Sequence, residues 1–413
     1  MVSEPVRLLH FADVHIGMEN YGTVDPATGA SSRVMDFLRR LTEIVEYAEQ
    51  NDADLAIFAG DAFKSSNPNP TYQREFARRI KRLAGQCPVV LLVGNHDIPA
   101  VSQRASSVEI FHTLAVDHVT VGRSDEIHLI ETKRGPVQVA TVPYPVRQRL
   151  LADVNNRGLN LGDLDMLLRE QVGVLLRDMA SQIDTSIPAV LTGHFTVQGA
   201  QLGSERGIML GRDVAVTVGT LADPAWDYVA LGHIHHFQDL NPGQQPPIVY
   251  AGSIERIDFG EESSPKGFCW VNLERGATSY QFVELAARPF VTIKVDARDA
   301  HRDPTQAVLK AIHKRDLKDA VVRVLIATSP ETDTLINQRE VETALSDAAF
   351  IAAIQREVDY PVRARLGVDR PEGLAPAELL ERYLVSKDTS PERLALLKEY
   401  AEMLFAEAAP GLD

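Results

Sequence analysis

Residues 89–97 decide the fold: they read Val-Val-Leu-Leu-Val-Gly-Asn-His-Asp, in which five apolar residues run directly into a glycine and three polar side chains. An apolar run without polar alternation is typical of a strand that is buried on both faces. Open α/β sheets place their functional groups at the carboxyl ends of such strands, which is where Asn95, His96 and Asp97 are expected to lie. A single histidine at a strand end is more often an ordinary hydrogen-bonded residue, so the pattern carries weight only where it recurs.

The same pattern recurs at four other strand ends. At four of the five ends a glycine immediately precedes the first polar residue, which lets the backbone turn tightly and approach an ion closely. The four additional runs are Val6–Ala12 before Asp13 and His15, Leu55–Gly60 before Asp61, Ala189–Gly193 before His194, and Tyr228–Gly232 before His233 and His235.

These five ends supply two aspartates, one asparagine and four histidines as candidate metal ligands, with no cysteine among them. Nitrogen and oxygen donors in this mixture suit Mn²⁺, Fe or Zn²⁺ better than a structural zinc cage. There are too many for one ion and enough for two. Each of these residues, taken alone, is explained by an ordinary structural role. Their joint occurrence at five strand ends favours a metal site. We interpret the histidines that lie outside these five strand ends, His10, His112, His118, His128, His236, His301 and His313, as structural or surface residues.

Amphipathic helices are predicted between the apolar runs, and two hairpins are predicted among them. The fold class that follows is α/β: a layered domain whose sheet is not purely parallel, with helices outside. The predicted helices cover residues 34–48, 71–84, 108–115 and 164–183, and the hairpins pair 126–132 with 137–142 and 267–273 with 279–285.

The pattern changes near Arg288 and Pro289. Residues 291–295 alternate like a half-exposed strand. Helices are predicted around 305–314 and 334–346 and strands at 320–327 and near 351–360, which indicates a small α+β domain. A joint at 370–376 contains proline and glycine and leads to two helices, predicted at 377–386 and 391–407. We therefore expect three domains, 1–288, 289–370 and 371–413.

Composition limits the protein class. The 413 residues are 45% hydrophobic and contain no apolar run long enough to cross a membrane. The N-terminus shows no signal-peptide pattern and two cysteines make no disulfide framework, so a cytoplasmic protein is expected. The net charge of −15 argues against coating nucleic acid through bulk electrostatics. This negative charge does not exclude binding of phosphates through metal ions, because carboxylate ligands count as acidic as long as no metal ion is bound to them.

The order D-x-H, G-D, G-N-H-D, G-H, G-H-x-H resembles the calcineurin-like metallophosphoesterases through most of residues 6–260. The stretches 13–17, 60–63 and 252–262 further resemble the SbcD-type nucleases of DNA double-strand-break repair. The resemblance implies a metal-dependent DNA nuclease, acting as exonuclease and endonuclease on phosphodiester bonds, with two divalent ions, Mn²⁺ being expected. A small-substrate phosphodiesterase or nucleotidase and a non-catalytic scaffold are the alternatives.

The same resemblance implies a role for each site residue. One ion would be held by Asp13, His15, Asp61 and His235, and the other by Asp61, Asn95, His194 and His233, with Asp61 bridging. His96 would be the catalytic residue that binds no metal, and Asp97 would secure its loop. Lys64 stands where SbcD relatives often carry histidine. It is either a phosphate contact or a solvated loop lysine.

Partners are also implied by the resemblance. The helix at 71–84 carries a basic face that includes Arg78 and Arg82, which is either a DNA contact or a solvated face. A homodimer is implied, and its candidate contacts Phe76, Ile80, Val108, Phe111 and Leu114 fit core packing nearly as well. The C-terminal helices either fold back on the body or bind an SbcC-like coiled-coil ATPase through Leu379, Tyr383, Leu397 and Phe405.

Overall fold

The computed structural model describes residues 4–27, 29–99, 105–146, 161–203, 213–360, 375–387 and 389–407. The chain divides into two compact units. These are Met1–Val295 with Val308–Leu325 and Asn337–Gln355, and Asp296–Ala307 with Ile326–Ile336 and Arg356–Asp413. The domain boundaries at residues 288 and 370 stay a prediction, and most of the predicted joint at 370–376 lies outside the described residues.

Two six-stranded mixed sheets form the larger unit, which confirms the expected α/β class with a sheet that is not purely parallel. In the first sheet the order is β14-β13-β1-β2-β3-β4, and β1 to β4 are parallel while β13 and β14 are antiparallel. Its strands are β1 (Val6–Phe11), β2 (Leu55–Phe58), β3 (Val89–Leu92), β4 (Val119–Gly122), β13 (Gly267–Leu273) and β14 (Ser279–Glu284).

The second sheet has the order β11-β12-β10-β7-β6-β5, with a parallel centre and antiparallel edges. Its strands are β5 (Glu126–Thr132), β6 (Gly135–Val142), β7 (Ala189–His194), β10 (Tyr228–Gly232), β11 (Gln238–Asp239) and β12 (Ile248–Tyr250). Both predicted hairpins are present, as β5–β6 and β13–β14.

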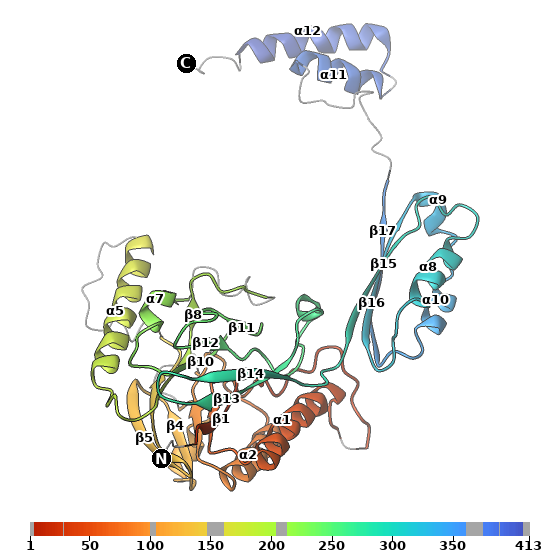
Figure 1. Ribbon diagram of the computed structural model, residues 1–413. Coiled ribbons are helices and arrows are strands. Elements are labelled where there is room, and N and C mark those ends of the chain that lie inside the picture. Colours follow the sequence, from red (N-terminus) through yellow and green to blue (C-terminus); the bar gives the residue numbers. More distant parts are fainter. Residues whose placement is uncertain are drawn as a thin grey trace. The chain divides into compact units, whose positions relative to one another are not determined.

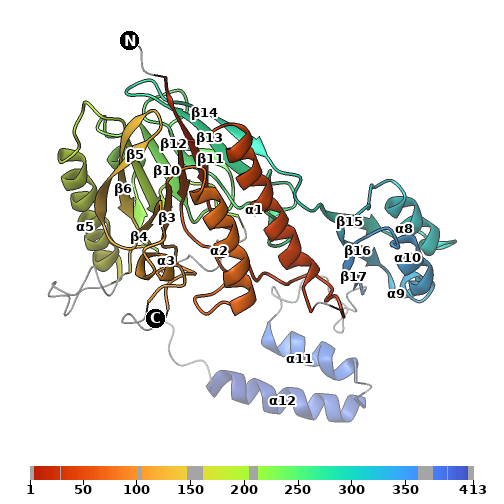
Figure 2. The same cartoon turned by 90° about the horizontal axis from the view of Figure 1, so that it is seen from below.

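Helices cover the outer face of each sheet, so the unit has four layers (Figures 1 and 2). Alternation along β1 shows how the layers are specified: Leu9 and Phe11 pack towards the helices, whereas Leu8 packs against the second sheet. The helices α1 (Ser32–Gln50) and α2 (Pro70–Ala84) lie side by side over the first sheet, and α5 (Leu161–Ser181) and α7 (Val218–Leu221) cover the second.

Short elements are where the prediction from sequence is incomplete. The helix expected at 108–115 contracts to α3 (Ile110–Thr113), and β4 was not predicted because its four residues carry no strong pattern. Other short elements are β8 (Thr196–Val197), β9 (Ala215–Val216) and η1 (Phe259–Glu261). Within the described ranges, no helix has the length and apolar character needed to span a membrane.

A three-stranded sheet in the order β15-β16-β17 follows, close to the predicted positions. The helix expected from residue 334 begins later because the Asn337 side chain accepts hydrogen bonds from the backbone N–H groups of Arg339 and Glu340 and caps α10. The elements are β15 (Phe290–Asp296), α8 (Pro304–Ile312), β16 (Val321–Thr328), α9 (Pro330–Asp333), α10 (Gln338–Ala344) and β17 (Phe350–Val358).

The last two helices are α11 (Pro376–Val385) and α12 (Pro391–Glu407), again close to their predicted positions. They pack against each other, and Lys398 Nζ forms an ion pair of 2.6 Å with Glu381 Oε2. Among the described side chains of the pair only Ala401 is buried, so most apolar groups of these two helices remain accessible.

Candidate metal centre

The carboxyl ends of five strands from both sheets meet at one place. Strands β1, β2 and β3 lead to Asp13, Asp61 and Asn95, and strands β7 and β10 lead to His194 and His233. Because parallel strands end at the same edge of a sheet, two facing sheets bring five such ends together. All seven predicted ligands are brought into this cluster, namely Asp13, His15, Asp61, Asn95, His194, His233 and His235.

The backbone at the cluster is unusual. Asp13, His15, Asp61 and His233 adopt positive φ angles of 50°, 46°, 63° and 98°. Non-glycine residues rarely occupy this region, and each such residue costs on the order of 1–3 kcal/mol that the surrounding fold must offset. Strained backbone of this kind concentrates at functional sites, so these angles support a functional role for the cluster.

The glycines that precede the candidate ligands are required by close approach. A Cβ atom on Gly94 would lie 2.2 Å from Asp61 Oδ1 and 2.4 Å from the Asp61 backbone nitrogen. One on Gly60 would lie 2.4 Å from His194 Nδ1, and one on Gly232 would lie 2.2 Å from the Ala59 carbonyl oxygen. These glycines are therefore required by the close approach of neighbouring protein groups, and their expected role in approaching an ion stays a prediction.

One half of the cluster contains Asp13, His15 and His235, each of which offers a ligand atom within 4.8 Å of the others. His15 Nε2 and His235 Nε2 face each other at 3.0 Å, and His15 Nε2 lies 3.7 Å from Asp61 Oδ2. Two imidazole nitrogens at this distance, beside two carboxylates, form a donor set that a divalent cation fits.

The other half is arranged around Asn95. Its Oδ1 lies 3.0 Å from His194 Nε2 and 2.9 Å from His233 Nδ1. His194 Nε2 also lies 3.4 Å from Asp61 Oδ2, so Asp61 contacts both halves of the cluster, as expected for a bridging residue.

The electrostatics of the cluster call for a cation. Asp13 and Asp61 are almost fully buried, and no lysine or arginine in the described part of the chain forms an ion pair with either. Burial raises the pKa of Asp13. For His194, burial acts to lower the pKa, but the carboxylates of Asp61 and Asp13 bring it up to about 9. Buried carboxylates are costly unless positive charge compensates them. His194 supplies part of that charge, and divalent cations bound by these oxygen and nitrogen donors would supply the rest.

His96 lies at the edge of the cluster and is partly exposed. Its backbone N–H donates to Asp61 Oδ1 (2.8 Å), and its Nδ1 lies 2.8 Å from the Lys64 carbonyl oxygen. The His15 and His96 rings are 4.9 Å apart, edge to face. The Lys64 side chain itself is exposed, which fits either predicted role, whereas its carbonyl orients His96.

Asp97 secures the loops, as expected from the sequence. Its carboxylate accepts hydrogen bonds from the backbone N–H groups of Gly94 and Asp61 (both 3.0 Å) and from Ser107 Oγ (2.8 Å). Burial and the nearby Asp61 charge raise the pKa of Asp97 to about 6. Asp97 thus ties the loop after β3 to the loop after β2.

Two carboxylates that hydrogen-bond to candidate ligand histidines, here called outer carboxylates, were not predicted from the sequence. Asp213 Oδ2 lies 2.8 Å from His233 Nε2, and Glu261 Oε1 lies 2.8 Å from His235 Nδ1. Carboxylates in this position orient metal-binding imidazoles and select their tautomer. Glu261 belongs to the run 252–262 that the sequence had singled out, whereas Asp213 carried no local signal.

The predicted basic face on α2 is largely neutralised by neighbouring acids. Arg82 makes two hydrogen bonds with Glu49 (2.7 and 2.6 Å), and Arg78 bonds with Glu75 (2.8 Å). Both arginines stay exposed. Their role as DNA contacts stays a prediction, and it concerns a face whose positive potential these ion pairs reduce.

Core packing is the observed role of four predicted dimer contacts. Phe76, Ile80, Val108 and Phe111 are buried in the core between the helices and the first sheet, so they present no surface to a partner, and only Leu114 is exposed. On the C-terminal helices Tyr383 is exposed, Leu379 and Leu397 are half-buried, and the side chain of Phe405 lies outside the described residues.

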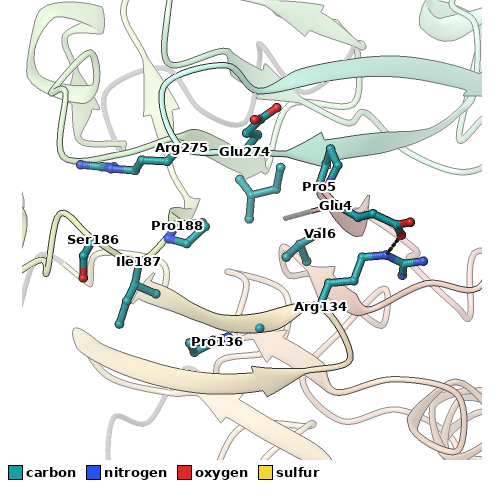
Figure 3. A pocket seen from close by; sticks show the side chains of 12 residues that line it. Glu4, Pro5, Val6, Arg134, Pro136, Ser186, Ile187, Pro188, Glu274 and Arg275 are labelled. Carbon is teal, nitrogen blue, oxygen red and sulfur yellow. Dashed lines mark hydrogen bonds and ion pairs between the residues drawn. The ribbon is translucent and has the colours of Figure 1, made fainter. Parts of the chain in front are cut away.

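A pocket of about 310 Å³ lies at the other end of β1, lined by Val6 at the start of that strand (Figure 3). Its two arginines are paired within the chain: Arg134 binds Glu4 and Asp54, and Arg275 binds Asp227. This pocket is therefore separate from the strand ends that carry the cluster.

Comparison with known proteins agrees with this geometry. A family model described as calcineurin-like phosphoesterase matches residues 6–237. The chain is 30% identical to the SbcD subunit of the SbcCD nuclease of Rhodobacter capsulatus over 418 aligned residues, covering 94% of this chain and 93% of that protein. It is 29% identical to the corresponding SbcD subunit of Bacillus subtilis over 300 residues, covering 70% of this chain and 72% of that protein.

Among solved structures, a dimetal phosphatase from Danio rerio matches 68% of this chain and 96% of its own, at 10% identity and a TM-score of 0.37. The family model spans more than half of the chain, and the Rhodobacter relative aligns over nearly its whole length. The chain therefore belongs to the calcineurin-like metallophosphoesterase family of hydrolases and is a homologue of the SbcD nuclease subunits.

Proposed function

We propose that this protein is a DNA nuclease subunit that hydrolyses phosphodiester bonds at a site of two divalent ions, Mn²⁺ being expected. The observation that carries the proposal is the meeting of seven residues with oxygen and nitrogen donors, among which Asp61 contacts both halves of the cluster. Asp13, His15, Asp61 and His235 would hold one ion, and Asp61, Asn95, His194 and His233 the other.

Bound divalent ions supply a nucleophilic hydroxide near neutral pH and neutralise the phosphodiester. The chain supplies the proton for the leaving oxygen. Because His96 Nδ1 is held by the Lys64 carbonyl, Nε2 is the ring atom at which His96 exchanges that proton. Asp97 keeps the loop of His96 in place by binding the backbone on either side of the site.

The homology supports a DNA role and an ATPase partner for this chain. Relatives with 29–30% identity are the SbcD subunits of SbcCD nucleases. We propose that this chain likewise acts on DNA ends in double-strand-break repair, as a homodimer with an SbcC-like ATPase. Accessible apolar residues on α11 and α12, among them Tyr383, Leu396, Tyr400 and Met403, suit a helical partner. Lys64, Arg78 and Arg82 are the candidate phosphate contacts.

The test compares wild type with His96→Ala on two substrates, bis-(p-nitrophenyl) phosphate and end-labelled linear duplex DNA, with and without Mn²⁺. Wild type should cleave both substrates only with Mn²⁺. The variant should lose about 10²–10⁴-fold in turnover, the usual contribution of positioned acid catalysis, and keep its metal content by elemental analysis. Cleavage of the small ester with intact duplex would contradict the nuclease proposal, and loss of both ions in the variant would contradict the role given to His96.

A further inference from the structure

The run Gly252–Glu262 lies directly behind His235 and has no role in the proposed chemistry. Its first residue, Gly252, has a φ of +75°, and a Cβ atom there would lie 2.9 Å from the His235 carbonyl oxygen. The backbone N–H of Ser253 donates to that same oxygen (3.1 Å). The run therefore begins in contact with the backbone of a candidate metal ligand.

Near its end the run returns to His235 through Glu261. The Oε1 atom accepts from His235 Nδ1 (2.8 Å), and Oε2 accepts from Lys266 Nζ and from the Ile257 backbone N–H, both at 2.9 Å. Because Nδ1 carries the hydrogen in this bond, Nε2 is the nitrogen of His235 that can bind a cation. Glu261 thus selects both the tautomer and the ring orientation.

Lys266 fixes this carboxylate in place. It is fully buried, and its ammonium group donates to Ser253 Oγ (2.7 Å), to the His235 carbonyl oxygen (3.0 Å) and to Glu261. An ammonium has three hydrogens to donate, and these three bonds use all of them. The side chain and the backbone of His235 are therefore held by one buried ion pair.

The next residue, Glu262, points to a different element. Its carboxylate accepts from the backbone N–H of Thr292 on β15 (2.9 Å) and from the Thr292 hydroxyl. Arg323 on β16 donates to that hydroxyl (2.9 Å), and its guanidinium lies 4.3 Å from the ring centre of Phe259 in the run. Arg256 adds bonds to the carbonyl oxygens of Ala287 and Arg288, just before β15.

From these contacts we propose that the Gly252–Glu262 run couples the metal site to the small sheet. The neighbouring carboxylates of Glu261 and Glu262 join the orientation of His235 to the position of β15. Cation binding at His235 then orders β15. Conversely, binding of DNA or a partner at β15 changes the affinity for the cation by the same factor, because coupling between two sites is reciprocal. Glu261 and Glu262 are positioning residues, and the inference rests on the proposed metal site.

The test uses three matched substitutions within the run, Glu261→Gln, Glu262→Gln and Glu255→Gln. Glu255 is the control, because it is as buried as Glu261 but accepts from the backbone of Arg256 and Arg288 and touches no candidate ligand. Mn²⁺ binding is measured by titration calorimetry. Hydrogen exchange of the peptide 289–296 is measured with and without Mn²⁺.

We expect Glu261→Gln to weaken one of two Mn²⁺ sites by about 10–100-fold, the usual effect of losing an outer carboxylate. Glu255→Gln should lower the melting temperature and bind Mn²⁺ like wild type. In wild type Mn²⁺ should slow exchange in 289–296, and Glu262→Gln should bind Mn²⁺ but lose this response.

Wild-type affinity in Glu261→Gln, or an unchanged exchange response in Glu262→Gln, would overturn the coupling alone. A wild-type protein that takes up no Mn²⁺ would overturn the proposed function and the coupling with it.

Discussion

Gly94→Ala tests whether the close approach of two loops creates the site. The new methyl carbon would lie 2.2 Å from Asp61 Oδ1 and 2.4 Å from the Asp61 backbone nitrogen, where carbon and oxygen in contact are normally about 3.3 Å apart. Rotating the Asp61 side chain relieves only the first clash, because the backbone nitrogen does not move with it. The loops after β2 and β3 must therefore separate.

Overpacking of this kind typically costs about 1–3 kcal/mol. Separation also breaks the bond from the His96 N–H to the Asp61 carboxylate, and bonds to charged groups contribute about 1.5–3 kcal/mol. We therefore expect a loss of about 3 kcal/mol or more in the free energy of unfolding. Because Asp61 contacts both halves of the cluster, both Mn²⁺ sites should weaken together.

The assay is urea unfolding in EDTA, combined with calorimetric titration of Mn²⁺. Gly173→Ala in α5 is the control, since its Cβ would meet its nearest atom, Arg177 Nη1, at an ordinary 3.4 Å. Replacing a helical glycine should stabilise that variant by up to about 1 kcal/mol. If Gly94→Ala had the urea midpoint of wild type and bound Mn²⁺ normally, the reasoning from close approach would be refuted.

Three further predictions concern the bridging role of Asp61, the C-terminal segment 371–413 and the buried His10. Asp61→Asn removes the charge shared by both halves of the cluster, so elemental analysis should find at least one ion lost along with activity, and two retained ions with normal rates would exclude a bridge. Deleting residues 371–413 should spare Mn²⁺-dependent hydrolysis of a small phosphodiester and abolish capture of an SbcC-like ATPase. A lower melting temperature of the truncated chain without any partner would show instead that this segment folds back on the rest of the chain. Burial lowers the pKa of His10 from 6.5 to about 3. As the pH falls below 6.5, this histidine therefore binds a proton in the unfolded chain but not in the folded chain. The free energy of unfolding therefore falls by about 2 kcal/mol between pH 7 and pH 5 on account of His10. Urea titrations at the two pH values should show that His10→Gln removes this part of the fall.

Much of the fold could be predicted because its signals are local. Short apolar runs that end at a glycine, such as Val89–Leu92, favour strands, and helices such as α1 and α2 show their buried face in the spacing of their apolar residues. The predicted ends were less accurate where a cap decides them, as with Asn337 before α10. Short strands such as β4 were missed because four residues show too little periodicity.

The candidate ligands could be predicted for a related reason. A strand that ends in glycine and a polar residue marks its own carboxyl end, and parallel pairing brings such ends to one edge. The arginines of α2 and the expected dimer contacts could not be judged in this way. Whether Arg82 meets DNA or Glu49, and whether Phe76 faces a partner or the core, depends on residues distant in sequence.

By itself, the sequence determined the α/β class, the positions of most helices and strands, and the residues that meet at the carboxyl ends. These depend on hydrophobic periodicity and on residue types at strand ends, which are properties of short segments. Only the tertiary structure decided that two sheets face each other to complete the cluster, and that Asp213 and Glu261 hold His233 and His235. Contacts of this kind join residues about 20 or more positions apart, and they are set by how the layers pack rather than by any local pattern.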